Sequence, residues 1–342
     1  MAEATVSNIP KDTKRLAFLP IVNPGLDKYY QLQKSVFWTP QEIPFKTDRE
    51  QFEKMDPGTK EFVTFIISLF AQLDGIVNDN LVNYFKKETA ELAKECSSTY
   101  AMFEAIEVIH NETYSMMIVA LISDPDERER ALDSINHYES IRAIAEWTYG
   151  WMKSGRPLLE RLLAFICIEG IIFMSPFAGI YWIKRMNKLP GLTKANEWIS
   201  RDEAIHTGFG CALYHHITSI WNTEDARRMP DGGLKERTEP LSTETVNSII
   251  TSAVDIAERF TREALKTELV GLDSTEMIGY IKCTADKVCE SLGFPLIYNV
   301  QNPFDWMAMI SLPNKSNIFE SRVTEYSRDT SDVFEFDLNA SF

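Results

Sequence analysis

The chain has 342 residues, of which 44% are hydrophobic, and its formal net charge is −15 at pH 7. The apolar fraction is ample for a buried core, and one large helical domain is within range for this length. The excess of acidic residues, together with the lack of a basic cluster in the sequence, argues against a nucleic-acid-binding surface.

The cysteines and the N-terminal segment indicate a cytoplasmic protein. The five cysteines are odd in number and include no Cys-x-x-Cys pair, which favours buried reduced thiols over a disulfide framework. Residues 1–18 lack the apolar segment of a signal peptide. We therefore expect the protein to reside in the cytoplasm.

One stretch, residues 162–183, is apolar enough to be considered as a membrane span. Glu169 is its only charged residue, and Arg161 and Lys184 flank it. Pro176, two glycines and the central glutamate argue against a membrane location. A helix that is apolar on every side is also what the centre of a large bundle requires, so we expect no membrane association.

In chain order, residues 1–30 are of mixed character, and we expect an N-terminal arm on the outside of the protein. Capping residues, proline turns and hydrophobic periodicity then predict a series of long helices. Asp56-Pro57, for example, places an N-cap residue before a proline at the first helical position. The expected helices span residues 57–87, 88–123, 125–154, 158–187, 193–221, 242–269 and 274–292, with a polar loop at 222–240.

The C-terminal residues differ from the rest of the chain. The helical pattern fades beyond Pro313, and residues 321–342 are acidic on balance and end in several aromatic residues. Such a segment is typical of a docking peptide that orders on a partner, although an untethered end fits the composition equally well. We expect an arm at 1–30, a helical domain at 31–320 and a flexible tail at 321–342.

The stretch from Glu104 to Tyr114 carries the first chemical motif. On an α-helix, Glu107, His110 and Tyr114 fall on one face, stacked over two turns. A carboxylate and a neutral imidazole three residues apart form a compact pair of ligands for a first-row metal ion. The phenol lies one turn further along, close enough to be affected by the metal.

A second Glu-x-x-His pair, Glu203 and His206, occurs although the chain has only five histidines. Ferritin-like dimetal proteins combine two such pairs with one carboxylate from each of two other helices. Asp74 and Glu169 meet that requirement, because each is an isolated acid in an apolar helix. A buried ionised carboxylate is costly unless it is neutralised, and two divalent cations would cancel four negative charges. The sequence therefore predicts an all-α, ferritin-like helical bundle with additional helices around a dimetal site.

Several stretches also match a known protein family. They are residues 35–39 (SVFWT), 74–78 (DGIVN), 107–110 (EVIH) with Tyr114, 169–173 (EGIIF), 200–203 (SRDE) with His206, 302–305 (NPFD) and 322–326 (RVTEY). They span nearly the whole chain in the order that the family has them. On these residues the chain resembles the small, radical-generating subunit of class I ribonucleotide reductase, in its eukaryotic-like branch.

The resemblance implies a dinuclear metal centre held by four carboxylates and two imidazoles. The residues that would bind one metal ion are Asp74, Glu107 and His110, and those that would bind the other are Glu169, Glu203 and His206. The family implies two iron ions, with dioxygen as the co-substrate of activation. Manganese or a mixed manganese–iron pair is the alternative, but relatives with the mixed pair usually lack the tyrosine that Tyr114 represents.

The resemblance also implies a radical path. Tyr114 would carry the radical in an apolar pocket that excludes water and reductants. The residues of that pocket would be Phe173, Phe177 and Ile199. Asp202 would link His110 to Trp38 as the inner end of an electron path, and Tyr326 on the tail would pass the oxidising equivalent to the large subunit.

By the same resemblance, the chain would form a homodimer and bind the large subunit through residues 336–342. The stored radical would serve the reduction of ribonucleotides to deoxyribonucleotides on that subunit. The chain has no Gly-rich phosphate loop, so no nucleotide site is expected here. Two alternatives share the ligands. A ferritin-like ferroxidase needs no Trp38, Asp202 or docking tail, and a stand-alone dimetal oxidase needs an open pocket beside Tyr114.

Overall fold

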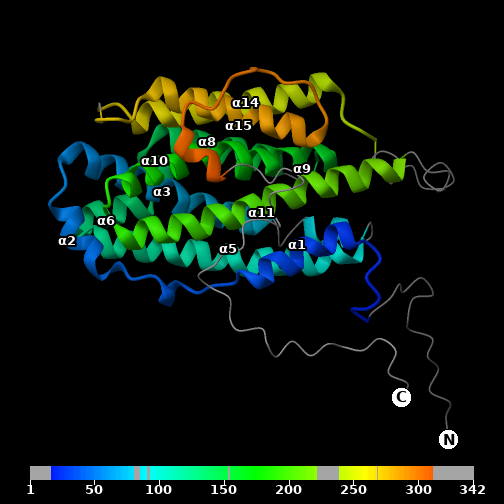
Figure 1. The fold of residues 1–342 in the computed structure, drawn as a ribbon, viewed down its shortest axis with the longest axis horizontal. Helices are drawn as coiled ribbons and strands as arrows, with labels where there is room; N and C mark the ends of the chain where they lie inside the picture. Colours follow the sequence, from blue (N-terminus) through cyan, green and yellow to red (C-terminus); the bar gives the residue numbers. More distant parts are fainter. Residues whose placement is uncertain are drawn as a thin grey trace, which may run out of the picture.

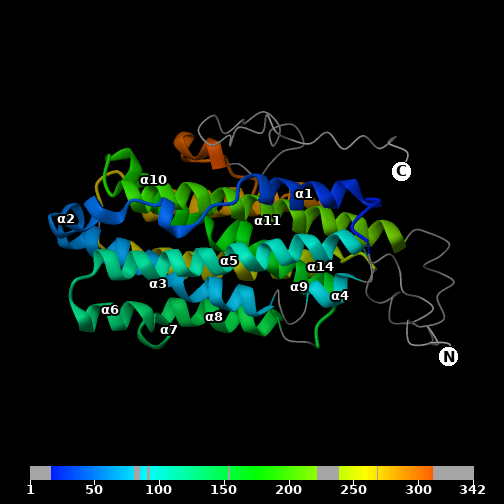
Figure 2. The same cartoon turned by 90° about the horizontal axis from the view of Figure 1, so that it is seen from below.

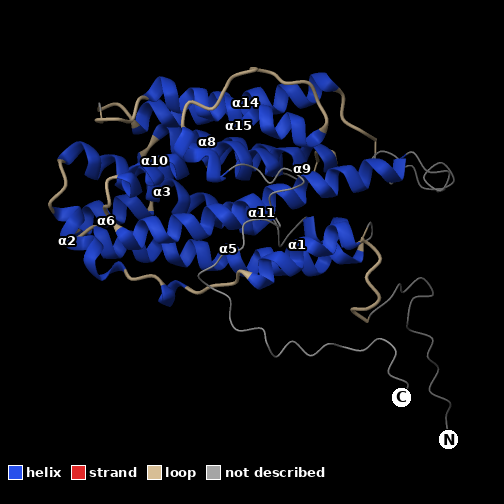
Figure 3. Ribbon diagram, in the orientation of Figure 1, coloured by secondary structure: helices blue, strands red, loops and turns tan. Residues whose placement is uncertain are grey.

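The computed structural model describes residues 17–80, 85–90, 93–152, 155–221, 239–267 and 269–310. In this part of the chain the protein is a bundle of helices without β-strands, apart from an isolated bridge between Leu269 and Leu272 (Figure 3). The longest helices run side by side along the long axis of the molecule (Figure 1, Figure 2). The predicted all-α bundle is confirmed.

The described α-helices and short turns have the following bounds. The α-helices are α1 (Pro24–Ser35), α2 (Asp48–Glu53), α3 (Pro57–Asn80), α4 (Lys86–Ala90), α5 (Lys94–Leu121), α6 (Pro125–Leu132), α7 (Ser134–His137), α8 (Glu139–Met152), α9 (Leu158–Cys167), α10 (Met174–Arg185), α11 (Pro190–Trp221), α14 (Thr243–Ala264) and α15 (Ser274–Leu292). Three short 3-10 helices are η1 (Pro40–Glu42), η2 (Phe45–Thr47) and η5 (Asp305–Ile310), and η4 (Ile168–Ile172) is a π-helical turn.

Four segments form the centre of the bundle: α3, α5, α11 and the continuous α9–η4–α10 segment. The helix α3 packs along α5, and α11 packs against α9 and α10. The helix α1 lies against α5 and α11, while α14 and α15 cover α9, η4 and α10 from the opposite side (Figure 1). The inner faces of the central segments are thus buried, while one face of α5 stays exposed.

Two helical segments are long and apolar enough to cross a membrane, Pro57–Asp79 and Leu158–Arg185. Only the second was expected from the sequence. The apolar window of Leu158–Arg185 is fully buried inside the protein, and 67% of the window in Pro57–Asp79 is buried. Other helices therefore cover their apolar surfaces, as they cover the core helices of a soluble bundle.

The apolar segment expected as one helix over 158–187 contains a π-helical turn, η4, between α9 and α10. The Phe173 N–H donates to the Ile168 carbonyl at 3.0 Å, which is an i to i−5 hydrogen bond. A turn of this kind displaces side chains relative to a regular α-helix, and such turns are frequent at functional sites. Glu169 lies within it.

The helix expected over 125–154 is three helices, α6, α7 and α8, because the chain leaves the helical conformation at Asp133 and Tyr138. Short polar side chains account for the first break. Asn136 donates a hydrogen bond to the Asp133 carboxylate at 2.8 Å, and the Ser134 hydroxyl donates to the Ser68 carbonyl at 2.9 Å. The Asn136 bond is local and competes with the backbone bonds of a continuous helix, whereas the Ser134 bond ties the break to α3.

The helix expected from residue 88 begins instead at Lys94 as α5, and Glu88 lies in the short α4. Glu95 holds the first turn of α5 in place, since it accepts hydrogen bonds from the Val22 backbone at 2.9 Å and the Asn23 side chain at 3.0 Å. An acid in this position also interacts favourably with the helix dipole. The start of α11 and the end of α14 differ from the prediction by a few residues, and the bounds of α15 agree with it.

The five cysteines are buried and unpaired, as expected. The predicted boundary after residue 30 falls within α1. Residues 1–16, 222–238 and 311–342 lie outside the described residues, and so do Tyr326 and the predicted tail. The division into arm, domain and tail stays a prediction, as does the cytoplasmic location.

A buried carboxylate fixes the start of α11. Asp48, at the start of α2, accepts hydrogen bonds from the backbone N–H groups of Gly191 at 3.0 Å and Leu192 at 2.7 Å. It thus satisfies two of the N–H groups that have no partner within the helix. A Cβ at Gly191 would lie 2.9 Å from the Asp48 carboxylate, so this close approach requires glycine.

Replacing Asp48 by alanine should destabilise the fold more than removing an exposed helix cap. The variant leaves two buried N–H groups without an acceptor, at a cost of about 3 kcal/mol. The control is Asp124→Ala, which removes the exposed cap of α6 and should cost about 1 kcal/mol. Urea unfolding followed by circular dichroism measures both losses. Equal losses in the two variants would contradict the role given to Asp48.

Candidate metal centre

Four helical segments bring six carboxylate and imidazole side chains together in the core. They are Asp74 from α3, Glu107 and His110 from α5, Glu169 from η4, and Glu203 and His206 from α11. Each is 0% or 1% exposed. Two groups have ligand atoms within 4.8 Å of one another: Asp74, Glu107 and His110 in one, and Glu107, Glu169, Glu203 and His206 in the other. All six residues that the sequence predicted are thus brought into one cluster, with Glu107 in both groups.

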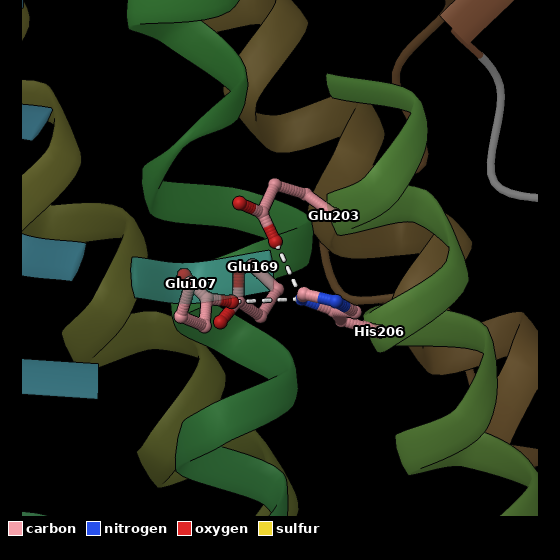
Figure 4. Close-up of side chains that lie close together, drawn as sticks. All are labelled: Glu107, Glu169, Glu203 and His206. Atoms are coloured by element: carbon pink, nitrogen blue, oxygen red, sulfur yellow. Dashed lines mark ion pairs between the residues drawn. The ribbon is translucent and has the colours of Figure 1, made fainter. Parts of the chain in front are cut away.

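Glu107 and Glu203 lie between the two imidazoles. Glu203 oxygens lie 2.7 Å from His206 Nδ1 and 3.1 Å from His110 Nδ1. Glu107 oxygens lie 2.9 Å and 3.5 Å from the same two nitrogens. Figure 4 shows Glu203 and His206 reaching from α11 toward Glu107 and Glu169. These two carboxylates therefore join both histidines into a single charged centre.

The residues present fit a pair of cations. Both carboxylate oxygens of Asp74 and of Glu169 lack a hydrogen-bond donor among the described residues. An uncompensated buried carboxylate is strongly unfavourable, so the cluster requires positive charge or protons. Mixed carboxylate and imidazole donors suit first-row divalent metals, including iron and manganese. Two such ions would balance the four carboxylates.

In the metal-free protein, protons supply part of this balance. Burial, reinforced by repulsion from Glu107, raises the pKa of Asp74 well above its usual range. Burial and the nearby Glu203 and Glu107 carboxylates raise the pKa of Glu169 in the same way. Both side chains therefore hold a proton more readily than ordinary carboxylic acids when no metal is bound.

The two histidines are instead held in their charged form. Burial alone would lower the pKa of His206, but the adjacent Glu203 carboxylate outweighs it and raises the pKa to about 9. Burial would also lower the pKa of His110, but the Glu203 carboxylate outweighs it and raises the pKa well above its usual range. The pKa of Glu203 is lowered despite burial, because both imidazolium groups attract its carboxylate. Ion pairs therefore hold this side of the metal-free centre together.

Tyr114 lies one turn beyond His110 on α5 and is completely buried. Burial, and then repulsion from Asp74 and Glu203, raises the pKa of the phenol well above its usual value of 10. Among the described residues, none accepts a hydrogen bond from its hydroxyl group. The phenol is therefore protonated at neutral pH.

A wall of three phenylalanine rings, Phe70, Phe173 and Phe177, begins against this phenol. The Phe70 ring stacks on Tyr114, with centroids 4.6 Å apart and planes at 9°. Phe70 in turn contacts Phe173 at 5.2 Å and Phe177 at 4.8 Å between ring centroids. Phe173, Phe177 and Ile199, the three predicted pocket residues, are all fully buried. Access of water to Tyr114 is thereby restricted.

Phe70 is the member of this wall that was not predicted from the sequence. It lies one turn before Asp74 on α3. Phe173, which the resemblance implied, also lies one turn from a ligand, Glu169, so an aromatic residue one turn from a predicted ligand is a signal that could have indicated Phe70.

Trp38 is connected to His110 through the Asp202 carboxylate. The Trp38 indole N–H donates to Asp202 Oδ2 at 2.7 Å, and the same oxygen lies 3.2 Å from His110 Nε2. The Trp38 ring also stacks on the imidazole, with centroids 5.9 Å apart and planes at 23°. Arg201 donates to Asp202 Oδ1 at 3.0 and 3.1 Å. Although burial alone would raise the pKa of Asp202, Arg201 and His110 lower it, so the carboxylate is ionised.

Metal binding should release protons, because the raised pKa values of Asp74, Glu169, His110 and His206 favour their protonated forms, and each must lose its proton before it binds a cation. The apparent affinity for ferrous ion should therefore rise with pH, by about tenfold per pH unit for each proton displaced. The His206 share of this dependence should end near its pKa of about 9. Anaerobic competition titrations at several pH values measure the affinity, and a pH-stat measures the released protons. His206→Ala should release fewer, whereas an affinity independent of pH would contradict the assignment.

Comparisons with known proteins point to one family. Residues 15–303 match the family model described as ribonucleotide reductase, small chain. The chain is 37% identical over 314 residues to the ribonucleoside-diphosphate reductase small chain of Nicotiana tabacum. The match covers 92% of this chain and 89% of the tobacco protein. The small chain of variola virus is 37% identical over 320 residues, covering 94% and 93%.

Solved structures share the fold. The ribonucleotide reductase Rnr4 homodimer from Saccharomyces cerevisiae is similar with a TM-score of 0.69 at 28% identity, covering 86% of this chain and 87% of that one. The dimanganese(II)-NrdF of Streptococcus sanguinis has a TM-score of 0.72 at 18% identity, covering 88% and 99%, and supports the fold alone. The predicted ferritin-like architecture is confirmed by these neighbours. With a match over most of its length, the chain belongs to the ribonucleotide reductase small-chain family, whose members are dimetal subunits of a two-subunit ribonucleoside-diphosphate reductase.

Proposed function

We propose that this chain binds two iron ions, uses dioxygen to convert Tyr114 into a stable tyrosyl radical, and provides that radical to a large subunit for ribonucleotide reduction. One observation carries the proposal. A fully buried phenol stands on the same helix as two residues of the carboxylate–imidazole cluster, inside a wall of phenylalanine rings. A ferroxidase has no need of that wall, and a stand-alone oxidase needs an open pocket where the wall stands.

The proposed ligands are Asp74, Glu107 and His110 for one ion, and Glu169, Glu203 and His206 for the other. Bound there, two iron ions would supply the one-electron oxidising chemistry of dioxygen activation. Manganese fits the same donors. Relatives with a mixed manganese–iron pair usually lack the tyrosine that Tyr114 represents, so its presence favours iron over that pair. The protein's own part is to hold the ligands, to exclude water and to keep the Tyr114 phenol beside the cluster.

Oxidation of Tyr114 must remove an electron and a proton together. The pKa of the phenol is raised above 10 by burial and by nearby carboxylates, so a phenolate is not available at neutral pH. The hydroxyl group has no hydrogen-bond acceptor among the described residues, which leaves it free to turn toward the cluster. Phe70 stacks on the ring and, with Phe173 and Phe177, would keep reductants from the radical.

A second chain of contacts would carry electrons between the centre and the protein surface. His110, Asp202 and Trp38 are joined by a shared carboxylate oxygen, at 3.2 Å from the imidazole and 2.7 Å from the indole nitrogen. Asp202 can accept the indole proton when Trp38 loses an electron, because the two atoms are already hydrogen-bonded. Trp38 would therefore act as a relay, with Tyr326 on the tail as the next step toward the large subunit.

We also propose two protein interfaces. The C-terminal residues 336–342 would dock on the large subunit, and a second copy of the chain would complete a homodimer, as in the Rnr4 homodimer of yeast. The helix α5 supports the second proposal, since it leaves Val108 (53% exposed) and Val119 (45% exposed) on one outward face. Exposed apolar residues on one helix face are typical of an interface.

The variant Tyr114→Phe should bind two equivalents of iron and fold normally, but it should show no tyrosyl signal in electron paramagnetic resonance after aerobic loading. Only the hydroxyl group is lost, so the packing against Phe70 is retained. Tyr100→Phe is the matched control, because Tyr100 is another fully buried tyrosine on α5. A tyrosyl signal that persists in Tyr114→Phe, or disappears in Tyr100→Phe, would refute the assignment.

Removing residues 336–342 should abolish turnover with the large subunit while leaving the tyrosyl signal and the iron content unchanged. A synthetic peptide of the same seven-residue segment should inhibit the full-length pair by competition, and a peptide of scrambled order should not. Full activity of the shortened chain would show that the tail is not the dock.

A further inference from the structure

A second tryptophan lies directly against Trp38. Trp198 is on α11, one turn before Asp202, and its ring centroid lies 5.3 Å from that of Trp38 with the planes at 52°. Aromatic rings at this separation are in contact. Trp38 thus has the His110 ring on one side at 5.9 Å and the Trp198 ring on another at 5.3 Å.

The three rings lead from the buried centre outward. His110 is 0% exposed and Trp38 is 3% exposed, whereas Trp198 is only half-buried. A soluble molecule therefore has little direct access to Trp38 but can approach Trp198. Since both residues are tryptophans, an electron can pass between them without a large intrinsic difference in potential.

The surroundings of the two indoles determine which of them is more easily oxidised. The Trp38 N–H donates to Asp202 at 2.7 Å, so an oxidised Trp38 can pass its proton to that carboxylate. Among the described residues, none accepts a hydrogen bond from the Trp198 N–H, and the Lys194 ammonium lies 4.6 Å from the Trp198 ring centroid. A cation over the ring is attracted by the neutral indole and repelled by an oxidised one. An electron vacancy is therefore more stable on Trp38 than on Trp198.

We propose that Trp198 is a redox relay through which a soluble one-electron reductant, such as ascorbate, delivers electrons to the buried Trp38. This inference rests on the proposed function, in which Trp38 carries electrons. In the first step Trp198 gives one electron to oxidised Trp38, and Asp202 returns the proton to the Trp38 nitrogen. In the second step the reductant gives one electron to oxidised Trp198. The positive charge of Lys194 destabilises oxidised Trp198. Trp198 is therefore oxidised only transiently while electrons pass to Trp38.

The test uses the metal-free full-length protein, so that it does not depend on iron chemistry. Azide radicals generated by pulse radiolysis oxidise accessible tryptophans, and the absorbance of the tryptophan radical is then followed with time. We expect the absorbance to contain a long-lived component from the Trp38 radical, which forms when Trp38 gives an electron to oxidised Trp198. Its amplitude should fall by about tenfold in Trp198→Phe. It should disappear in Trp38→Phe.

The protein contains a matched control pair. On α8, Trp147 and Trp151 have ring centroids 6.1 Å apart at 58°, and Arg156 lies over Trp151 at 3.9 Å. Trp151→Phe removes a tryptophan with a similar partner and a similar cation, and it should leave the long-lived component intact. Equal losses in Trp151→Phe and Trp198→Phe, or no loss in Trp198→Phe, would overturn the inference.

Two further variants control for misfolding of Trp198→Phe and test whether the Lys194 charge makes Trp198 harder to oxidise. Trp198→Tyr keeps an oxidisable ring at the same position and should restore part of the component that Trp198→Phe loses. Lys194→Met keeps the side-chain length without its charge, so added ascorbate should quench the long-lived component faster than in the wild type. An unchanged rate in Lys194→Met would contradict the role given to the ammonium group.

Iron loading with limiting ferrous ion separates this inference from the proposed function. With ascorbate as the source of the missing electron, Trp198→Phe should prolong the tryptophan radical signal in freeze-quenched samples while Tyr114 is still oxidised. If Tyr114 forms its radical in every variant and the tryptophan signal decays equally fast with and without Trp198, only the role of Trp198 is overturned. If no tyrosyl signal forms in the wild type, the proposed function itself fails.

Discussion

Charge balance in the core is the constraint on which this protein depends. Four carboxylates lie in an interior built largely of Leu, Ile and Phe side chains, and ionised carboxylates are unstable there without positive charge. In the metal-free chain, burial and neighbouring carboxylates favour the protonated forms of Asp74 and Glu169, while Glu203 is paired with two imidazolium groups. Two cations would replace these protons at the same positions. Metal binding and proton release are therefore two sides of one equilibrium.

The surroundings of the cluster differ on its two sides, and the difference is consistent with the two roles that we propose for them. Toward Tyr114 the neighbours are phenylalanine rings without hydrogen-bonding groups, which suits the storage of a radical. Toward Trp38 the neighbour is the Asp202 carboxylate, which accepts hydrogen bonds from the Trp38 indole and from Arg201 and can accept or return the indole proton. In the proposed function, the apolar side would protect the radical on Tyr114. The polar side would transfer electrons and protons when the oxidising equivalent is released.

The cluster was predictable because its signals are local in sequence. Glu107 and His110 share a helix face through their spacing, and Glu169 is the only charge in an apolar run. The contacts that depend on tertiary packing were not predictable in the same way. The stacking of Phe70 on Tyr114 brings two helices together, and the π turn at Glu169 leaves no distinct residue pattern. The break between α6 and α7 likewise involves a hydrogen bond from Ser134 to Ser68 on α3, which periodicity does not detect.

The most direct test of the account is the position of iron in the loaded protein. Crystals prepared anaerobically with ferrous ion and measured at the iron absorption edge would locate the metal by its anomalous signal. The account predicts two adjacent sites, one in contact with Asp74 and His110, the other with Glu169 and His206, and both in contact with Glu107 or Glu203. A single site, or Asp74 or Glu169 turned away toward other partners, would contradict it.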